Sequence, residues 1–100
     1  KGGVRTLVKQ IRRLFEYNEW RKAIFFRDNF TCINCGKRGN RLNADHHPIS
    51  FAKIIHENKI ESVDDALKCF MLWDIRNGRT LCLECHKLTP NYLKSYVRTN

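Results

Sequence analysis

Two Cys-x-x-Cys pairs, Cys32/Cys35 and Cys82/Cys85, constrain the fold of this 100-residue chain more than any other feature. Each pair can present two thiolates to one ion, and Zn²⁺ prefers four ligands in a tetrahedron. The long loop between the pairs is no obstacle, because the entropy of loop closure grows slowly with loop length. Gly36, directly after the first pair, suits a tight turn around a metal. The spacing therefore predicts one structural zinc site with four cysteine ligands.

Other interpretations of the cysteines are a disulfide, a redox-active dithiol, buried thiols or a haem attachment site. The segment Cys82–His86 matches the pattern for covalent attachment of a c-type haem. A haem would leave Cys32 and Cys35 without a role, and it would need Met71 or a second histidine as distal ligand. The fifth cysteine, Cys69, lies among apolar residues at helical spacing, so we expect it in the core.

Length and composition indicate a single basic domain, spanning residues 1–100. Apolar residues make up 42% of the chain, which is enough for a thin core that a zinc site would staple together. The formal net charge of +9 favours contact with phosphate backbones, although a solvated lysine-rich surface would give the same charge. No signal peptide is recognisable, and the longest apolar run, Cys69–Trp73, is too short to cross a membrane. With reduced thiols as ligands, we expect the cytoplasm and no membrane partner.

The sequence predicts two helices within the first 26 residues. An amphipathic pattern runs from Val4 to Tyr17, with Leu14 and Phe15 on its apolar face. A second helix is expected after Asn18 as N-cap, ending at Asp28. The basic stripe of the first helix offers candidate contacts to nucleic acid: Arg5, Lys9, Arg12 and Arg13.

Further helices are predicted on either side of the second cysteine pair. Residues 50–72 read as a helical insertion with helices at Phe51–Glu57 and Val63–Met71, the latter capped by Ser62. Residues 90–100 predict a short C-terminal helix, with Pro90 at its first position. The overall prediction is an α+β fold that is mainly helical.

Between the cysteine pairs stands Asp45-His46-His47, and Asn77 lies five residues before Cys82. Together with Cys82-x-x-Cys85-His86, these residues resemble the HNH endonucleases, particularly the phage-encoded branch. The resemblance covers residues 27–89. It implies a ββα-metal (His-Me finger) core, in which two short antiparallel strands and a helix surround one catalytic divalent ion and the cysteines form a separate zinc site.

Phosphodiester hydrolysis needs a base for the attacking water and positive charge near the phosphorus. We assign His46 as general base and Asp45 with His86 as ligands of the catalytic ion. By the resemblance, Asn77 hydrogen-bonds the backbone and holds the base in place. The carboxylate suits Mg²⁺ or Mn²⁺, while a histidine ligand also admits Ni²⁺, Co²⁺ or Zn²⁺.

The register at the histidine pair has an alternative. Many HNH members begin with His-His, which would make His46 the metal ligand and His47 the base. Asp45 would then lie behind the metal ligands or cap the backbone. Because both schemes use neighbouring residues, they suggest a strand end or bulge here.

The sequence thus predicts an endonuclease that depends on a divalent metal and hydrolyses DNA phosphodiester bonds, in the host cytoplasm if it is phage-encoded. Arg76, Arg79 and Lys87 are further candidate phosphate contacts. The alternative is a zinc-stabilised nucleic-acid-binding module without catalysis. The pattern leaves open whether the protein is a monomer or a homodimer.

Overall fold

The computed structural model describes residues 3–39 and 41–89, with side chains from Thr6 onward. About half of this part is helical, and it contains one two-stranded antiparallel sheet. The predicted C-terminal helix at 90–100 and the side chain of Arg5 lie outside the described residues.

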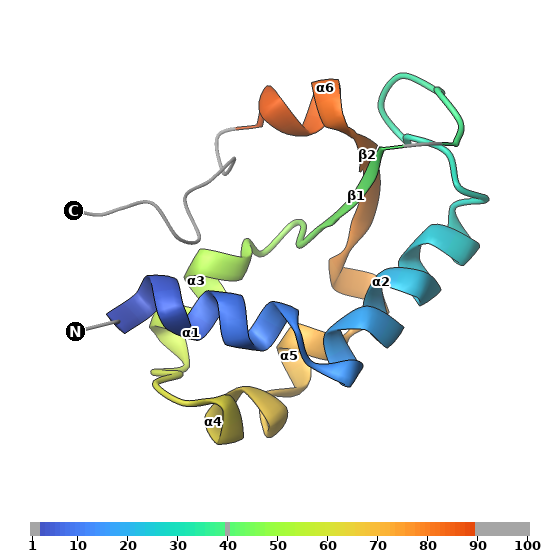
Figure 1. The fold of residues 1–100 in the computed structure, drawn as a ribbon. Coiled ribbons are helices and arrows are strands. Elements are labelled where there is room, and N and C mark those ends of the chain that lie inside the picture. Colours follow the sequence, from blue (N-terminus) through green and yellow to red (C-terminus); the bar gives the residue numbers. More distant parts are fainter. Residues whose placement is uncertain (1–2, 40, 90–100) are drawn as a thin grey trace.

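The N-terminal region forms two helices whose boundary differs from the prediction. α1 spans Gly3–Arg12 and α2 spans Phe15–Arg27, so the expected continuous helix to Tyr17 is wrong. Leu14 has an extended backbone (φ −69°, ψ 148°), and Phe15 is 71% exposed instead of facing the core. The break redirects the chain so that α1 packs against α4 while α2 packs against both strands. Figure 1 shows the two helices running in different directions.

The sheet joins two segments that are far apart in the sequence. β1 (Leu42–Asp45) pairs with β2 (Arg79–Cys82), so that Leu42 faces Cys82 and Asp45 faces Arg79. The short helix α6 (Leu83–Lys87) follows β2 directly and contacts both strands. One end of β2 therefore carries a cysteine, and the other end faces Asp45.

The helical insertion lies between the strands. α3 (Phe51–Glu57) has the predicted bounds, and its N-cap Ser50 accepts a hydrogen bond from Lys53 N at 3.1 Å. It is followed by α4 (Val63–Leu67), α5 (Phe70–Trp73) and the 3₁₀ turn η1 (Ile75–Asn77). Figure 1 shows α4 at the opposite end of the molecule from α6.

The predicted continuous helix Val63–Met71 is wrong, because the chain breaks between α4 and α5. The carbonyl of Ala66 accepts hydrogen bonds from Cys69 N at 3.1 Å and from Trp73 Nε1 at 3.0 Å. In an unbroken α-helix this carbonyl would bond the N–H four residues on. The indole takes part of that role, and Cys69 becomes the extended residue before α5.

The core consists of a large apolar cluster and a small one. Cys69 is half-buried and packs against the large cluster, as predicted. The small cluster surrounds the end of β2 and consists of Cys32, Leu81 and Cys82, with Leu42 and Cys85 packed against it. The buried residues of the large cluster come from α1, α3, α4, α5 and one loop: Leu7, Val8, Ile11, Phe51, Ile54, Ile55, Ile60, Ala66 and Leu72. Among the described helices, none has the length and apolar character that a membrane span requires.

Candidate functional site

The four cysteines of the two Cys-x-x-Cys pairs converge at one end of the sheet. Their sulfur atoms all lie within 4.8 Å of one another, and Cys35 Sγ is 3.8 Å from Cys82 Sγ. A tetrahedral zinc site with Zn–S bonds of about 2.3 Å requires neighbouring sulfurs about 3.8 Å apart. All four are free thiols. The cluster therefore has the donor set and the size to hold a metal ion, and it includes both sulfurs that a covalent haem would need.

The backbone around the cluster explains why these sulfurs meet. Gly36 N donates to Cys32 O at 2.9 Å, and Gly36 has φ +82°, a left-handed conformation that glycine adopts without strain. Ile33 N donates to Thr80 O at 3.0 Å, which ties this loop to β2. On the other side, Cys82 is the N-cap of α6, and its sulfur accepts a hydrogen bond from Cys85 N at 3.5 Å.

The cysteines differ in how readily they ionise. Burial opposes ionisation of Cys32, but backbone N–H groups around its sulfur outweigh this and lower its pKa to about 6. The pKa of Cys85 is raised to about 11, because burial and the other three sulfurs outweigh the stabilising amide of Asn34. Four thiolates so close together repel one another, and a bound cation would remove this repulsion.

A second pair of potential metal ligands lies at the other end of β1. Asp45 is buried, its Oδ2 accepts a hydrogen bond from Arg79 Nε at 2.9 Å, and its Oδ1 lies 3.8 Å from His86 Nε2. Two ligands of one divalent ion, each about 2.1 Å from it, stand between about 3 and 4 Å apart. The pair has this spacing, and Asp45 stands at a strand end, as both sequence-based schemes expected.

Burial is the main influence on His86, and it favours the neutral imidazole. Burial lowers the pKa of His86, while the carboxylate of Asp45 opposes that change. The guanidinium groups of Arg12 and Arg79 lower it further. A neutral imidazole has a lone pair for a metal ion.

His46 is more buried than the prediction of a general base suggested. The residue is 5% exposed, and its ring stacks on Trp20 with centroids 4.0 Å apart and planes 11° apart. Nε2 lies 3.0 Å from the carbonyl of Leu72, which can only accept, so Nε2 carries the proton. Burial lowers the pKa of His46 to about 4, and its neutral ring therefore has its lone pair on Nδ1. The neighbouring His47 is exposed.

Asn77 makes the backbone contacts that the resemblance implied for it. It is 7% exposed, its Oδ1 accepts from Ile49 N at 2.9 Å, and its Nδ2 donates to Ile49 O at 2.8 Å. These two hydrogen bonds tie the segment after His47 to the turn before β2. The same turn is held by Arg27, which donates to Ile75 O at 2.8 Å and to Gly78 O at 2.9 Å.

The predicted phosphate contacts fall into different surroundings. Arg76 is exposed and pairs with Asp74, whereas Arg79 is half-buried and pairs with Asp45. The exposed Arg12 is close enough to His46 and His86 for its charge to lower the pKa of both. The other candidates with described side chains are exposed: Lys9, Arg13 and Lys87.

Sequence reasoning missed two partners of the candidate base. They are the indole of Trp20, which stacks on the ring of His46, and the carbonyl of Leu72, which accepts its hydrogen bond. No pattern in the sequence signals either contact, since α2 and α5 meet the end of β1 only in the folded chain.

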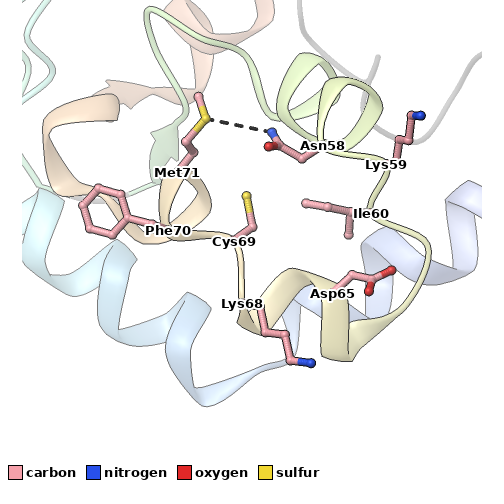
Figure 2. A pocket seen from close by; sticks show the side chains of 8 residues that line it. All are labelled: Asn58, Lys59, Ile60, Asp65, Lys68, Cys69, Phe70 and Met71. Carbon is pink, nitrogen blue, oxygen red and sulfur yellow. Dashed lines mark hydrogen bonds between the residues drawn. The ribbon is translucent and has the colours of Figure 1, made fainter.

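A cavity of about 420 Å³ lies in the helical insertion, apart from the cysteine cluster. Figure 2 shows the thiol of Cys69 turned toward its interior and the ring of Phe70 turned away. Asn58 Nδ2 lies 3.9 Å from Met71 Sδ across it. Its lining residues are Asn58, Lys59, Ile60, Asp65, Lys68, Cys69, Phe70 and Met71.

No family model, no curated protein and no solved structure matches this chain.

Proposed function

We propose that this protein is a divalent-metal-dependent endonuclease of the HNH type that hydrolyses phosphodiester bonds in DNA. The observation that carries the proposal is the 3.8 Å approach of Asp45 Oδ1 and His86 Nε2, beside the buried His46. The arrangement of β1, β2 and α6 supports assignment to the ββα-metal fold. In this proposal the four-cysteine cluster holds a structural Zn²⁺.

The residues around the pair support distinct roles in hydrolysis. His46 would accept the proton of the attacking water at Nδ1, because its Nε2 is committed to the carbonyl of Leu72. Asn77 would keep the segment after the histidines in place through its two bonds to Ile49. A Mg²⁺ or Mn²⁺ ion held by Asp45 and His86 would supply positive charge to the phosphoryl group and the departing oxygen.

The charge of the protein supports a nucleic-acid substrate. The chain carries a formal net charge of +9, and phosphate contacts of this kind need no particular base sequence. Arg12 is the best-placed candidate contact on α1, since its guanidinium lies 5.5 Å from the ring centroid of Phe51, which in turn packs beside His46.

His47 is the alternative base. It is exposed, whereas His46 is packed between Trp20 and Phe51. In this scheme His46 would be a metal ligand, and water would reach His47 directly.

A second candidate function is a zinc-stabilised module that binds nucleic acid without cleaving it. The burial of His46 favours it, because a ring that stacks on Trp20 and bonds Leu72 has a packing role without any catalysis. This candidate predicts DNA binding that survives replacement of His46 and no cleavage with any divalent metal.

The test is relaxation of supercoiled plasmid by the zinc-loaded protein with added Mg²⁺ or Mn²⁺. The variants are Asp45→Asn, His46→Gln and His47→Ala, and the control is His56→Ala, which removes an exposed histidine on α3. His46→Gln keeps an amide donor for the carbonyl of Leu72 and disturbs packing less than alanine would. Zinc content and circular dichroism establish that each variant is folded.

We expect nicking by the wild-type protein and the His56 variant, a loss of about 10²-fold or more in the Asp45 and His46 variants, and little change for His47→Ala. Loss of activity in the His47 variant would move the base to His47, because the His46 scheme predicts little change there; His46→Gln would also lose activity under that alternative, as a metal-ligand variant. Binding without cleavage under every metal condition would refute the endonuclease and favour the binding module.

A further inference from the structure

A larger cavity, of about 740 Å³, lies where α2, the cysteine loop and the start of β1 meet. We call it the arginine–phenylalanine groove. It has no part in the chemistry proposed above. Its lining residues, all within the described ranges, include three arginines and no acidic residue: Arg21, Phe25, Phe30, Arg38, Gly39, Arg41 and Leu42.

Two phenylalanines give the groove an aromatic wall. The rings of Phe25 and Phe30 stand 6.4 Å apart at 44°, and Phe30 is 43% exposed. Phe30 has φ +53°, a conformation that bulky residues rarely adopt, so the turn presents this ring at a conformational cost. An exposed aromatic ring of this kind is the usual platform for stacking an unpaired base.

The arginines surround this wall with positive charge. Arg21 lies over the ring of Phe25, with Cζ 4.9 Å from its centroid. Arg38 is held in place by Asn29, to whose backbone carbonyl and side-chain oxygen it donates at 3.1 and 3.3 Å. Charge with an aromatic wall fits a phosphate backbone with accessible bases, whereas an acidic peptide would use the charge alone.

The groove also lies at a suitable distance from the Asp45–His86 pair. Leu42, which lines the groove, is the first residue of β1, and Asp45 is the last. Three residue steps span about 10 Å of strand, a distance that a few nucleotides of an unpaired strand can cover. The groove is therefore within a few nucleotides of the candidate metal pair.

The alternation of side chains along β1 favours a single strand over a duplex. Leu42 and Asp45 are three positions apart, so they belong to opposite faces of the sheet. A nucleic acid that reaches both must bend around β1 within a few nucleotides. A duplex is too stiff for this, with a persistence length of about 50 nm, whereas an unpaired strand can bend.

From these observations we propose that the arginine–phenylalanine groove binds unpaired nucleotides that flank the cleaved bond. The preferred substrate is then a duplex with a single-stranded segment. This inference rests on the proposed function for the place of cleavage, but the binding itself can be measured separately.

The test is fluorescence anisotropy with zinc-loaded protein and no added catalytic metal. The probes are a labelled blunt duplex and the same duplex with a single-stranded tail of about six nucleotides. The variants are Phe30→Leu, which keeps an apolar side chain, and Arg41→Gln. Lys22→Gln is the control, because Lys22 is exposed on α2 and does not line the groove.

We expect the tailed probe to bind more tightly than the blunt one, and Phe30→Leu to weaken the tailed probe at least about fivefold while leaving the blunt probe unchanged. Arg41→Gln should weaken the tailed probe more than Lys22→Gln does. Equal affinity for both probes, or a Phe30 variant with wild-type binding, would overturn the inference. The inference would also be overturned if poly-glutamate competed as strongly as a single-stranded oligonucleotide at the same concentration of charge.

The two proposals fail in different ways. Plasmid nicking without a preference for the tail would refute the groove and leave the endonuclease standing. A preference for the tail that depends on Phe30, with no cleavage under any metal condition, would support the groove and refute the endonuclease.

Discussion

Replacing Gly78 by alanine should destabilise the fold by overpacking the contact between α2 and the turn before β2. Gly78 is buried and has φ −162°, an extended conformation that any residue adopts. The cost is therefore steric. A Cβ at this position would lie 2.6 Å from Ile24 Cδ1 and 2.7 Å from Trp20 Cζ2, which real Cβ atoms do not tolerate.

The size of the effect follows from the immobility of these neighbours. Ile24 and Trp20 are 0% and 3% exposed, so neither can swing into solvent. Overpacking of this kind costs about 1–3 kcal/mol. The lower entropy of the unfolded alanine chain offsets about 0.4–1 kcal/mol of that. We expect a net loss of about 2 kcal/mol in the free energy of unfolding, because two buried side chains are displaced.

Urea unfolding of the zinc-loaded protein, followed by circular dichroism, measures this loss. Ile24→Val removes the Cδ1 atom of the closest contact and should cost about 0.5–1.5 kcal/mol alone. The loss of unfolding free energy in the double variant should be smaller than the sum of the two single losses by about 0.5 kcal/mol or more. A Gly78→Ala protein within about 0.5 kcal/mol of wild type, or strict additivity with Ile24→Val, would refute the steric argument.

Three further predictions concern the cysteine cluster, the turn before β2 and the break between α1 and α2. Cys82→Ser should abolish stoichiometric zinc binding, measured by elemental analysis, and remove most of the free energy of unfolding, since structural zinc contributes on the order of 10 kcal/mol in small domains. The control Cys69→Ser should keep one ion per chain. Asn77→Ala should lower the free energy of unfolding in urea by about 2–3 kcal/mol, because the backbone N–H and C=O of Ile49 lose their hydrogen-bond partner. A smaller loss would mean that water replaces the amide of Asn77. Phe15→Ser should change stability by under about 0.5 kcal/mol while Ile11→Ala costs about 2–5 kcal/mol, and equal losses would place Phe15 in the core.

The elements that could be predicted from the sequence are those fixed by local chemistry. The cysteine cluster follows from the spacing of its ligands, and α3 follows from a short apolar pattern. The break between α4 and α5 could not be predicted, because it depends on the indole of Trp73 bonding the carbonyl of Ala66. The early end of α1 likewise depends on which partner each helix packs against.

In the candidate site, too, some features could be predicted from the sequence and others depend on contacts made only in the folded chain. The resemblance to a known family implied that Asp45, Asn77 and His86 act together, and the register of the strands places Asp45 opposite Arg79. That register also directs Arg79 to the carboxylate, in addition to its predicted contact with phosphate. The burial of His46 comes from Trp20, on a helix that no local pattern connects to it.

Helix α6 has a thermodynamic consequence for metal binding. It contains only five residues, and the adjacent Cys85 and His86 belong to different groups, one to the sulfur cluster and the other to the pair with Asp45. An ion that fixes the sulfurs also fixes the direction of this helix, and with it the imidazole. Occupancy of the two sites should therefore be linked, and linkage is reciprocal. Zinc should tighten the binding of the second ion, and the second ion should tighten the binding of zinc by the same free energy of coupling.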